Sequence, residues 1–248
     1  MKHINKDNLV FGTRAILETI EAGKEIDKLL IQKGLSNDLI KELIKVAKSY
    51  GVPFSTVPIE KLNRVTRKNH QGAIAYISSI QYASLDNVIN ETYQKGKEPL
   101  LLMLDRVTDV RNFGAVARTA ECAGVDAIII PSRGGAAINA DAMKTSAGAL
   151  NYIPICREDN LKKTLDYLKQ SGITIFACTE KATESIYSCD FNKPAAIIMG
   201  SEEDGISEEY LKLSDHQMFI PMSGNIDSLN VSVSAGIAVF EAVRQRSL

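Results

Sequence analysis

Three segments of the sequence carry polar residues whose types and spacing could support chemistry. In the first, LDRVTDVRNFGAVARTAECAGV, Arg118 follows Asn112 by six residues, and Gly114 opens a helical pattern rich in small residues. A guanidinium is effectively always protonated, so Arg118 would carry a positive charge. Considered singly, a solvated helical residue is the commoner outcome for Arg118, and Asn112 could be a helix cap.

The second segment, IIMGSEEDGIS, places two glycines and three carboxylates directly after an apolar run. Gly200 and Gly205 permit a tight excursion of the backbone beside a ligand. The carboxylates of Glu202, Glu203 and Asp204 precede a predicted helix, so complementing the dipole of that helix is an alternative explanation for them.

The third segment, IPMSGNIDSLNVSVSAGIAVFEAVRQR, ends in the longest helical pattern of the chain. Ser228 and Asn230 stand just ahead of that helix, where capping its first turn is again the simpler alternative. The helix presents an apolar face that could belong to the core or to a seam between two copies of the chain. Its members are Val233, Ile237, Phe240 and Val243.

The apolar pattern predicts the sheet that positions these segments. After residue 98, apolar runs alternate with helical patterns, which is typical of a parallel α/β sheet covered on both faces. Ligands bind such sheets at loops leaving the carboxyl ends of strands, here after Leu104, Met199 and Ile220. These patterns alone indicate an α/β enzyme that binds a nucleotide. The expected strands are PLLLMLD, Ala127–Pro131, Ile173–Cys178, Ala195–Met199 and Met218–Pro221, and the expected helices are Ala115–Ala123, Leu161–Gln170 and Ser232–Arg246.

The part of the chain before this sheet predicts a separate small α/β domain over residues 1–78. A linker over residues 79–97, with one short helix at Asp86–Tyr93, connects it to the second domain, residues 98–248. In the first domain we expect helices at Arg14–Ala22 and Asp38–Lys48, the latter capped by Ser36, and strands at Lys28–Gln32, Val52–Val57 and Ala73–Ile77.

The composition is that of an ordinary globular protein, with 45% hydrophobic and 24% charged residues in 248. No apolar run approaches the roughly 20 residues that span a bilayer, and the N-terminus lacks a signal-peptide pattern, so we expect a cytoplasmic protein without membrane contact. No metal-ligand cluster or CxxC pair is present, so we expect no metal and buried, reduced thiols. The cysteines are Cys122, Cys156, Cys178 and Cys189.

The charge is distributed unevenly along the chain. Residues 1–78 contain 13 Lys and Arg against 8 Asp and Glu, a balance of +5, whereas the remaining residues contain 16 against 22, a balance of −6. This asymmetry suggests that the first domain meets a polyanion, although a solvated charged surface explains it as well.

Three motifs resemble, in their order and spacing, the SpoU/TrmH branch of the SPOUT RNA methyltransferases. They are DRVTDVRNFGAVARTAECAG, MGSEEDG and IPMSGNIDSLNVSVSAGIAVFEAVRQR. The resemblance covers nearly the whole chain and is nearest to the bacterial enzymes that methylate a 23S rRNA guanosine at its 2′-oxygen. It implies an α/β fold with a SPOUT-type parallel sheet and a C-terminal deep trefoil knot, preceded by a small α/β RNA-binding domain. It also implies a homodimer whose site is completed across the subunit interface.

The resemblance implies that S-adenosyl-L-methionine (AdoMet) is the methyl donor and RNA the partner. Arg118 would grip a phosphate and stabilise the forming alkoxide, because a guanidinium is a poor base. The positions that match the family's catalytic residues are Asn112, Arg118, Glu202, Ser228 and Asn230. The four besides Arg118 would orient the arginine, the nucleotide and the cofactor. The matching cofactor-binding positions are Gly200, Gly205, Ile220, Met222 and Leu229.

The sequence departs from the family pattern at two positions. Val110 replaces a proline that would make the first loop rigid, and Glu203 replaces a glycine. If that glycine has a positive φ in relatives, Glu203 would be strained and the loop shaped differently.

Three alternatives remain beside an rRNA 2′-O-methyltransferase. A tRNA enzyme would use the same chemistry, but the N-terminal domain favours the ribosomal branch. A non-catalytic RNA-binding assembly factor would be expected to lose Arg118, Asn112 or the SLN triplet, and all are present. Methylation of a base nitrogen fits poorly. We expect RNA contacts from Arg14, Arg64, Arg67 and Lys68 in the basic domain.

Overall fold

The computed structural model describes residues 9–226 and 228–247. The chain divides into two compact units, of which the first runs to Gln81 and includes Ile138–Ala140, and the second comprises the rest from Tyr82 onward. The division falls inside the segment expected to be a linker, residues 79–97. Most of this segment belongs to the second unit, because helix α4 (Leu85–Gln94) buries Leu85 and Ile89 in the hydrophobic core of that unit.

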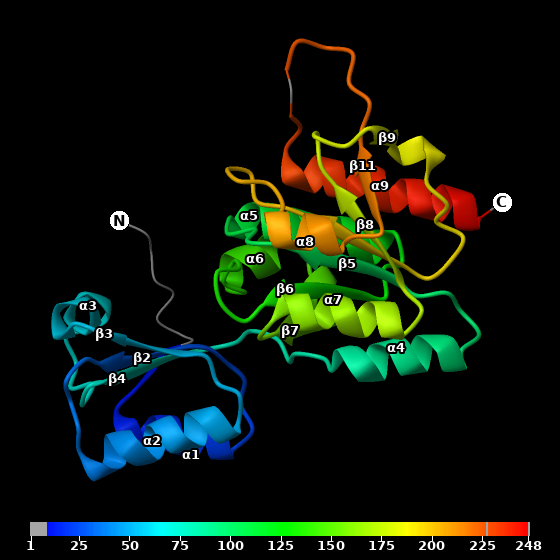
Figure 1. Cartoon of the computed structure of the whole chain (residues 1–248). Coiled ribbons are helices and arrows are strands. Elements are labelled where there is room, and N and C mark those ends of the chain that lie inside the picture. The colour runs from blue at the N-terminus through cyan, green and yellow to red at the C-terminus, as the bar shows by residue number, and fades with distance from the viewer. Residues whose placement is uncertain (1–8, 227, 248) are drawn as a thin grey trace. The chain divides into compact units, whose positions relative to one another are not determined.

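The first unit is a four-stranded sheet with helices on both faces. The strand order is β1-β4-β2-β3, with β4 antiparallel to β1 and β2, and β3 parallel to β2. Helices α1 and α2 pack on one face and α3 on the other (Figure 1). The elements are β1 (Leu9–Phe11), α1 (Thr13–Glu21), β2 (Ile26–Gln32), α2 (Asp38–Ser49), β3 (Phe54–Val57), α3 (Ile59–Val65) and β4 (Ala73–Ile77).

The expected helices and strands of this unit are confirmed to within a few residues at each end. The cap of α2 is Asn37 rather than Ser36, because the Asn37 side chain accepts the backbone N–H of Ile40 at 2.9 Å. The strand β1 and the helix α3 were not expected, since elements of three and seven residues are too short to show a clear period.

The second unit confirms the predicted parallel α/β fold. Its seven strands follow the order β7-β6-β5-β10-β8-β11-β9, and all neighbouring pairs are parallel. The elements after α4 are β5 (Leu100–Leu104), α5 (Val110–Cys122), β6 (Ala127–Pro131), α6 (Ala140–Thr145), β7 (Ile155–Glu158), α7 (Leu161–Gln170), β8 (Thr174–Cys178), β9 (Glu184–Ser185), β10 (Ala195–Met199), α8 (Glu208–Leu213), β11 (His216–Phe219) and α9 (Val231–Arg246).

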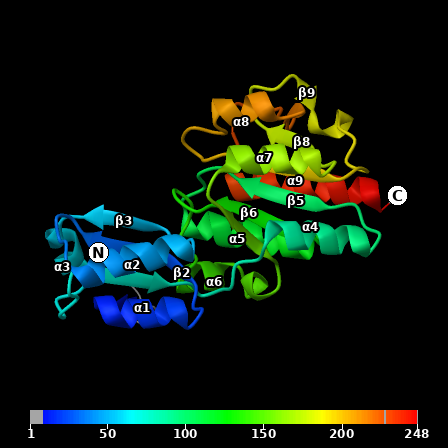
Figure 2. The same ribbon diagram turned by 60° about the horizontal axis from the view of Figure 1, so that its bottom comes forward.

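The central strand β5 is buried along its whole length, as its uninterrupted apolar sequence predicts. On one face, Leu101 and Met103 pack in a cluster with α4, α7 and α8, which lie on the same side of the strands in Figures 1 and 2. On the other face, α5 and α9 pack side by side, and α9 contacts β10. The sheet is therefore held rigidly between two helical layers.

The last helix is fixed to segments far from it in the sequence. The Arg246 guanidinium donates hydrogen bonds to the carbonyls of Phe191 at 2.8 Å, Glu98 at 2.6 Å, Pro99 at 3.1 Å and Lys193 at 2.7 Å. These bonds join the end of α9 to the chain just before β5 and just before β10.

Two expectations for the second unit are wrong. Helix α5 begins at Val110 instead of Ala115, because the Asp109 side chain accepts the backbone N–H groups of Arg111 and Asn112 and caps the helix. Asn112 is therefore not the cap. Cys122 is exposed at the end of α5 rather than buried. Among the described residues, no helix has the length and apolar character required to cross a membrane.

Candidate functional site

A cavity of about 440 Å³ opens at the carboxyl edge of the second sheet. Three connections form its wall: the one after β8, the one after β10, and the long one after β11 that enters α9. The sheet order explains why they meet, since β10, β8 and β11 are adjacent parallel strands. The wall consists of residues 178–181, 199–205, Ile220, Met222, 228–231 and Ser234.

The loop after β10 turns back tightly on itself. Ser201 and Gly205 exchange two backbone hydrogen bonds, of 3.2 and 3.0 Å, so that the backbone of Gly200 lies against Gly205. A Cβ atom at Gly200 would lie 2.1 Å from the carbonyl carbon of Gly205, a distance that no side chain tolerates. Gly205 itself has a φ of +66°, which favours glycine. Both predicted glycines therefore line the cavity for identifiable steric reasons.

Glu203 carries none of the backbone strain considered for it from the sequence. The non-glycine residues with positive φ among those described are Gln71, Arg106 and Ala147. The left-handed position of the loop falls on Gly205 instead, so a glutamate fits at position 203.

A chain of hydrogen bonds joins the three segments identified in the sequence. The Asn112 amide donates to the Glu202 carboxylate, and the Asn230 amide donates to Asn112 Oδ1 at 3.1 Å. Asn230 Oδ1 accepts the backbone N–H and the hydroxyl of Ser232, so Asn230 also caps α9. Asn112 does not line the cavity but connects two residues that do.

The carboxylate run is not explained by a helix dipole. Helix α8 begins only at Glu208, after its N-cap Ser207, and its first turn holds Glu208 and Glu209. Glu202, Glu203 and Asp204 instead line the cavity, together with Glu180 and one cation, Lys181. Asp204 forms an ion pair with Arg106, and the remaining three carboxylates against one ammonium favour a cationic ligand.

Arg118 is the one predicted catalytic residue that neither lines the cavity nor is hydrogen-bonded to a described residue that does. It lies exposed on α5, outside the cavity wall, and makes no hydrogen bond or ion pair with the described residues. Its neighbour Thr119 faces Gly236 of α9, whose exposed face carries Val233 and Phe240, each 49% exposed. Within a single chain Arg118 therefore does not meet the other site residues, and the expectation that the site is completed across a subunit interface stays a prediction.

The connection after β8 was missed by the sequence analysis. Cys178, Thr179, Glu180 and Lys181 line the cavity, but the expected strand at Ile173–Cys178 gave no sign that it lies between β10 and β11. Burial, with a smaller contribution from Glu180, raises the pKa of the Cys178 thiol to about 12. Cys178 therefore lines the cavity as a neutral, unreactive group.

The basic residues predicted to contact RNA are exposed in the first unit. Arg64 lies on α3, Arg67 and Lys68 lie between α3 and β4, and Arg14 lies on α1. The Lys68 ammonium stands 5.6 Å from the centre of the Phe11 ring. No group of three or more His, Cys, Asp or Glu residues that could hold a metal occurs within the described part of the chain.

Two family models match the chain. The model described as "SpoU rRNA Methylase family" matches residues 99–240, which include every residue that lines the cavity. The model described as "RNA 2'-O ribose methyltransferase substrate binding" matches residues 9–83.

Individual relatives agree with these matches. The "Putative TrmH family tRNA/rRNA methyltransferase YacO" of Bacillus subtilis (strain 168) is 32% identical over 238 residues, which are 96% of each chain. The crystal structure of the SpoU methyltransferase AviRb from Streptomyces viridochromogenes matches with a TM-score of 0.61 and 25% identity, covering 96% of this chain and 89% of that one. The structure of AviRb in complex with AdoMet matches with a TM-score of 0.61 at 24% identity. It covers 96% of this chain and 90% of that one, and it shows the shared fold.

The close approach at Gly200 yields a prediction for stability. Gly200→Ala forces a Cβ atom against the backbone of Gly205 and Ile206, so we expect a loss of about 1–3 kcal/mol in the free energy of unfolding. Urea denaturation measures it. Gly224→Ala is the matched control, because nothing lies within 4 Å of its Cβ position, and it should change stability by less than about 0.5 kcal/mol. Equal stability of the two variants would contradict this view of the loop.

Proposed function

Because the chain belongs to the SpoU/TrmH family of RNA methyltransferases, we propose that it transfers the methyl group of AdoMet to a ribose 2′-hydroxyl of RNA. The observation that carries the proposal is the cavity at the carboxyl edge of the sheet. Its wall combines the loop of Gly200, the strand end at Ile220 and the segment Ser228–Asn230, the positions at which the family motifs fall.

The residues of the cavity fit AdoMet as the cofactor. The volume of about 440 Å³ lies within the range of small-molecule sites. Gly200, Ile220 and Leu229, whose backbone groups the family resemblance assigns to the cofactor, line the cavity, and Met222 adds apolar surface. AdoMet supplies an activated methyl group on a sulfonium cation, and the carboxylates around the cavity favour that positive charge over a neutral sulfur.

The polar residues then have complementary tasks. The ribose hydroxyl must be held in line with the methyl group, and such positioning is worth about 7–11 kcal/mol in favourable cases. The hydrogen-bonded chain of Glu202, Asn112 and Asn230 fixes the wall against which the nucleotide is oriented. Arg118 grips a phosphate and stabilises the negative charge that develops on the 2′-oxygen as it takes the methyl group from sulfur, and the hydroxyl proton passes to water.

This task of Arg118 requires a second copy of the chain, and we propose a homodimer formed through α9 and α5. The exposed apolar stripe on α9, Val233 and Phe240 with the partly buried Ile237 between them, supports this proposal. Burying that stripe against a second copy would bring Arg118, on the adjacent helix α5, toward the cavity of that copy.

Ribosomal RNA is the proposed substrate, methylated in the cytoplasm on a guanosine. The match of residues 9–83 to a substrate-binding family supports a separate recognition domain, and the exposed cations on it suit phosphates. The relative from Bacillus subtilis is named for tRNA and rRNA alike, so tRNA is the alternative substrate. The deep trefoil knot also remains a proposal, supported by β10 lying between β5 and β8 in the sheet.

Methyl transfer is tested with labelled AdoMet and unmodified RNA. The full-length protein should incorporate label into 23S rRNA and not into tRNA. The product should resist alkaline cleavage at the modified nucleotide, because a methylated 2′-oxygen cannot attack the adjacent phosphate. Label on tRNA alone would select the alternative substrate, label on a base would contradict ribose methylation, and no label on any RNA would contradict the activity.

Mixing two inactive variants tests whether Arg118 acts across a dimer. Arg118→Ala and Asn112→Ala should each lose about 100-fold or more in kcat, the magnitude expected for an essential charge-stabilising group. Co-refolded together in equal amounts, they should regain about a quarter of wild-type activity, because half of the dimers contain one intact site. If Arg118 acted within its own chain, no mixed dimer would have an intact site and the mixture would stay inactive.

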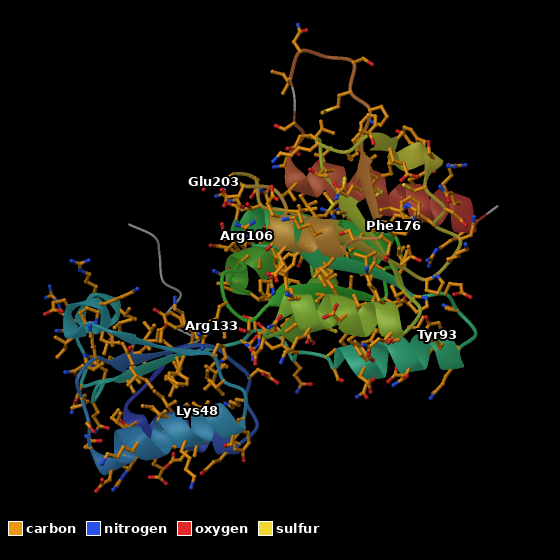
Figure 3. All side chains as sticks on the ribbon, in the orientation of Figure 1. Lys48, Tyr93, Arg106, Arg133, Phe176 and Glu203 are labelled. Atoms are coloured by element: carbon orange, nitrogen blue, oxygen red, sulfur yellow. The ribbon has the colours of Figure 1, made fainter. Side chains whose placement is uncertain are left out.

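RNA binding by the first unit predicts a salt dependence. The double charge reversal Arg67→Glu/Lys68→Glu should weaken RNA binding and lower the slope of log K against log salt by roughly 1–2, since each lost phosphate contact removes about 0.7–0.9. Lys45→Glu/Lys48→Glu, on the exposed side of α2, is the matched control (Lys48 is labelled in Figure 3). An unchanged affinity and slope for the first variant would show that these residues do not contact RNA.

A further inference from the structure

Arg106 occupies a strained backbone position at the end of strand β5. Its φ is +58°, in the left-handed region that residues with side chains rarely adopt. Such a conformation persists only where the surroundings compensate for it, and it is common beside functional sites. Arg106 lies within the first sequence motif, but nothing in the sequence alone assigns a role to it.

The guanidinium of Arg106 spans from strand β5 to the cavity loop. Its Nη1 donates to the Asp204 carboxylate at 3.1 Å, and its Nη2 donates to the carbonyl of Gly205 at 3.2 Å. On the other side, Nε and Nη2 donate to the two carboxylate oxygens of Asp105, at 3.1 and 3.3 Å. Figure 3 shows Arg106 at the same edge of the unit as Glu203, which belongs to that loop.

Asp105 anchors this arrangement in the core. Its side chain is only 2% exposed and also accepts the backbone N–H of Ser207 at 2.7 Å and the Ser207 hydroxyl at 2.6 Å. Its own N–H donates to the carbonyl of Met199 at 2.8 Å. Asp105 therefore fixes both ends of the loop, Met199 through its backbone N–H and Ser207 through its buried carboxylate. The same carboxylate orients the guanidinium that holds the turn itself.

We propose that Arg106 is a positioning residue for cofactor binding, which holds the turn Ser201–Gly205 in the conformation that lines the cavity. This inference rests on the proposed function, in which the cavity binds AdoMet. Asp204 and Gly205 line the cavity, whereas Arg106 does not, so Arg106 acts through them rather than on the ligand.

The expected effect is on affinity rather than on the chemical step. Without the guanidinium, the turn keeps its internal hydrogen bonds but loses its attachment to β5, so the binding-competent conformation is populated only in part. If that population falls to about a tenth, the Kd for AdoMet rises about tenfold. At saturating AdoMet the turn is held by the ligand, and kcat should stay near the wild-type value.

Arg106→Gly removes the guanidinium without adding backbone strain. Glycine adopts a positive φ without cost, but the loss of the ion pair with the buried Asp105 carboxylate should lower the Tm, so binding is compared at a temperature at which both proteins are folded. We expect a Kd and a KM for AdoMet raised about tenfold, a kcat within about twofold, and faster hydrogen exchange at the amides of Asp204 and Gly205 in the unliganded protein. Ala147→Gly is the matched control, since Ala147 also has a positive φ, of +51°, but does not line the cavity, and it should change none of these.

The inference is overturned if folded Arg106→Gly binds AdoMet with the wild-type Kd, or if exchange at Asp204 and Gly205 is unchanged. Failure of the proposed function gives a different result. A wild-type protein that binds no AdoMet would contradict the cofactor assignment, and the exchange rates alone would then decide whether Arg106 holds the turn.

Discussion

The parallel pairing of β5 with β10 is the constraint on which the rest of the site depends. Its register places Leu104 beside Met199, so the two strands end together and their following segments begin side by side. Three of the cross-connections described above follow from that pairing. The Asp105 carboxylate reaches Ser207, Arg106 reaches Asp204 and Gly205, and Asn112 reaches Glu202. One stretch of eight residues after β5 thus shapes the loop after β10.

Much of this arrangement was predictable because the signals are local. The apolar run LLLML predicts a buried central strand, and the glycines of MGSEEDG predict a tight turn, whose steric basis is the contact of Gly200 with Gly205. Capping was the simpler alternative considered for Asn230, and Asn230 does cap α9, but its amide also bonds to Asn112, which no local pattern indicates. The family resemblance, confirmed by the matches over residues 9–83 and 99–240, related the three motifs to one function.

The remaining features depend on contacts between distant parts of the chain. The strand order cannot be derived from periodicity, so the connection after β8 escaped attention although it forms part of the cavity wall. Arg106 showed no signal because neither its backbone strain nor its partners, 98 and 99 residues away, are visible in the sequence. Arg118 is a different case, since its proposed partner surface lies on another copy of the chain, and a single chain leaves it exposed.

The central claim is that these converging connections enclose AdoMet at the carboxyl edge of the sheet. A cocrystal structure of the full-length protein with AdoMet tests it most directly. The account predicts ligand density inside the cavity, in contact with Gly200, Ile220 and Leu229, with Arg118 of a second copy facing the sulfonium methyl group. Density for AdoMet elsewhere on the chain, or a dimer that leaves Arg118 in solvent, would contradict the account.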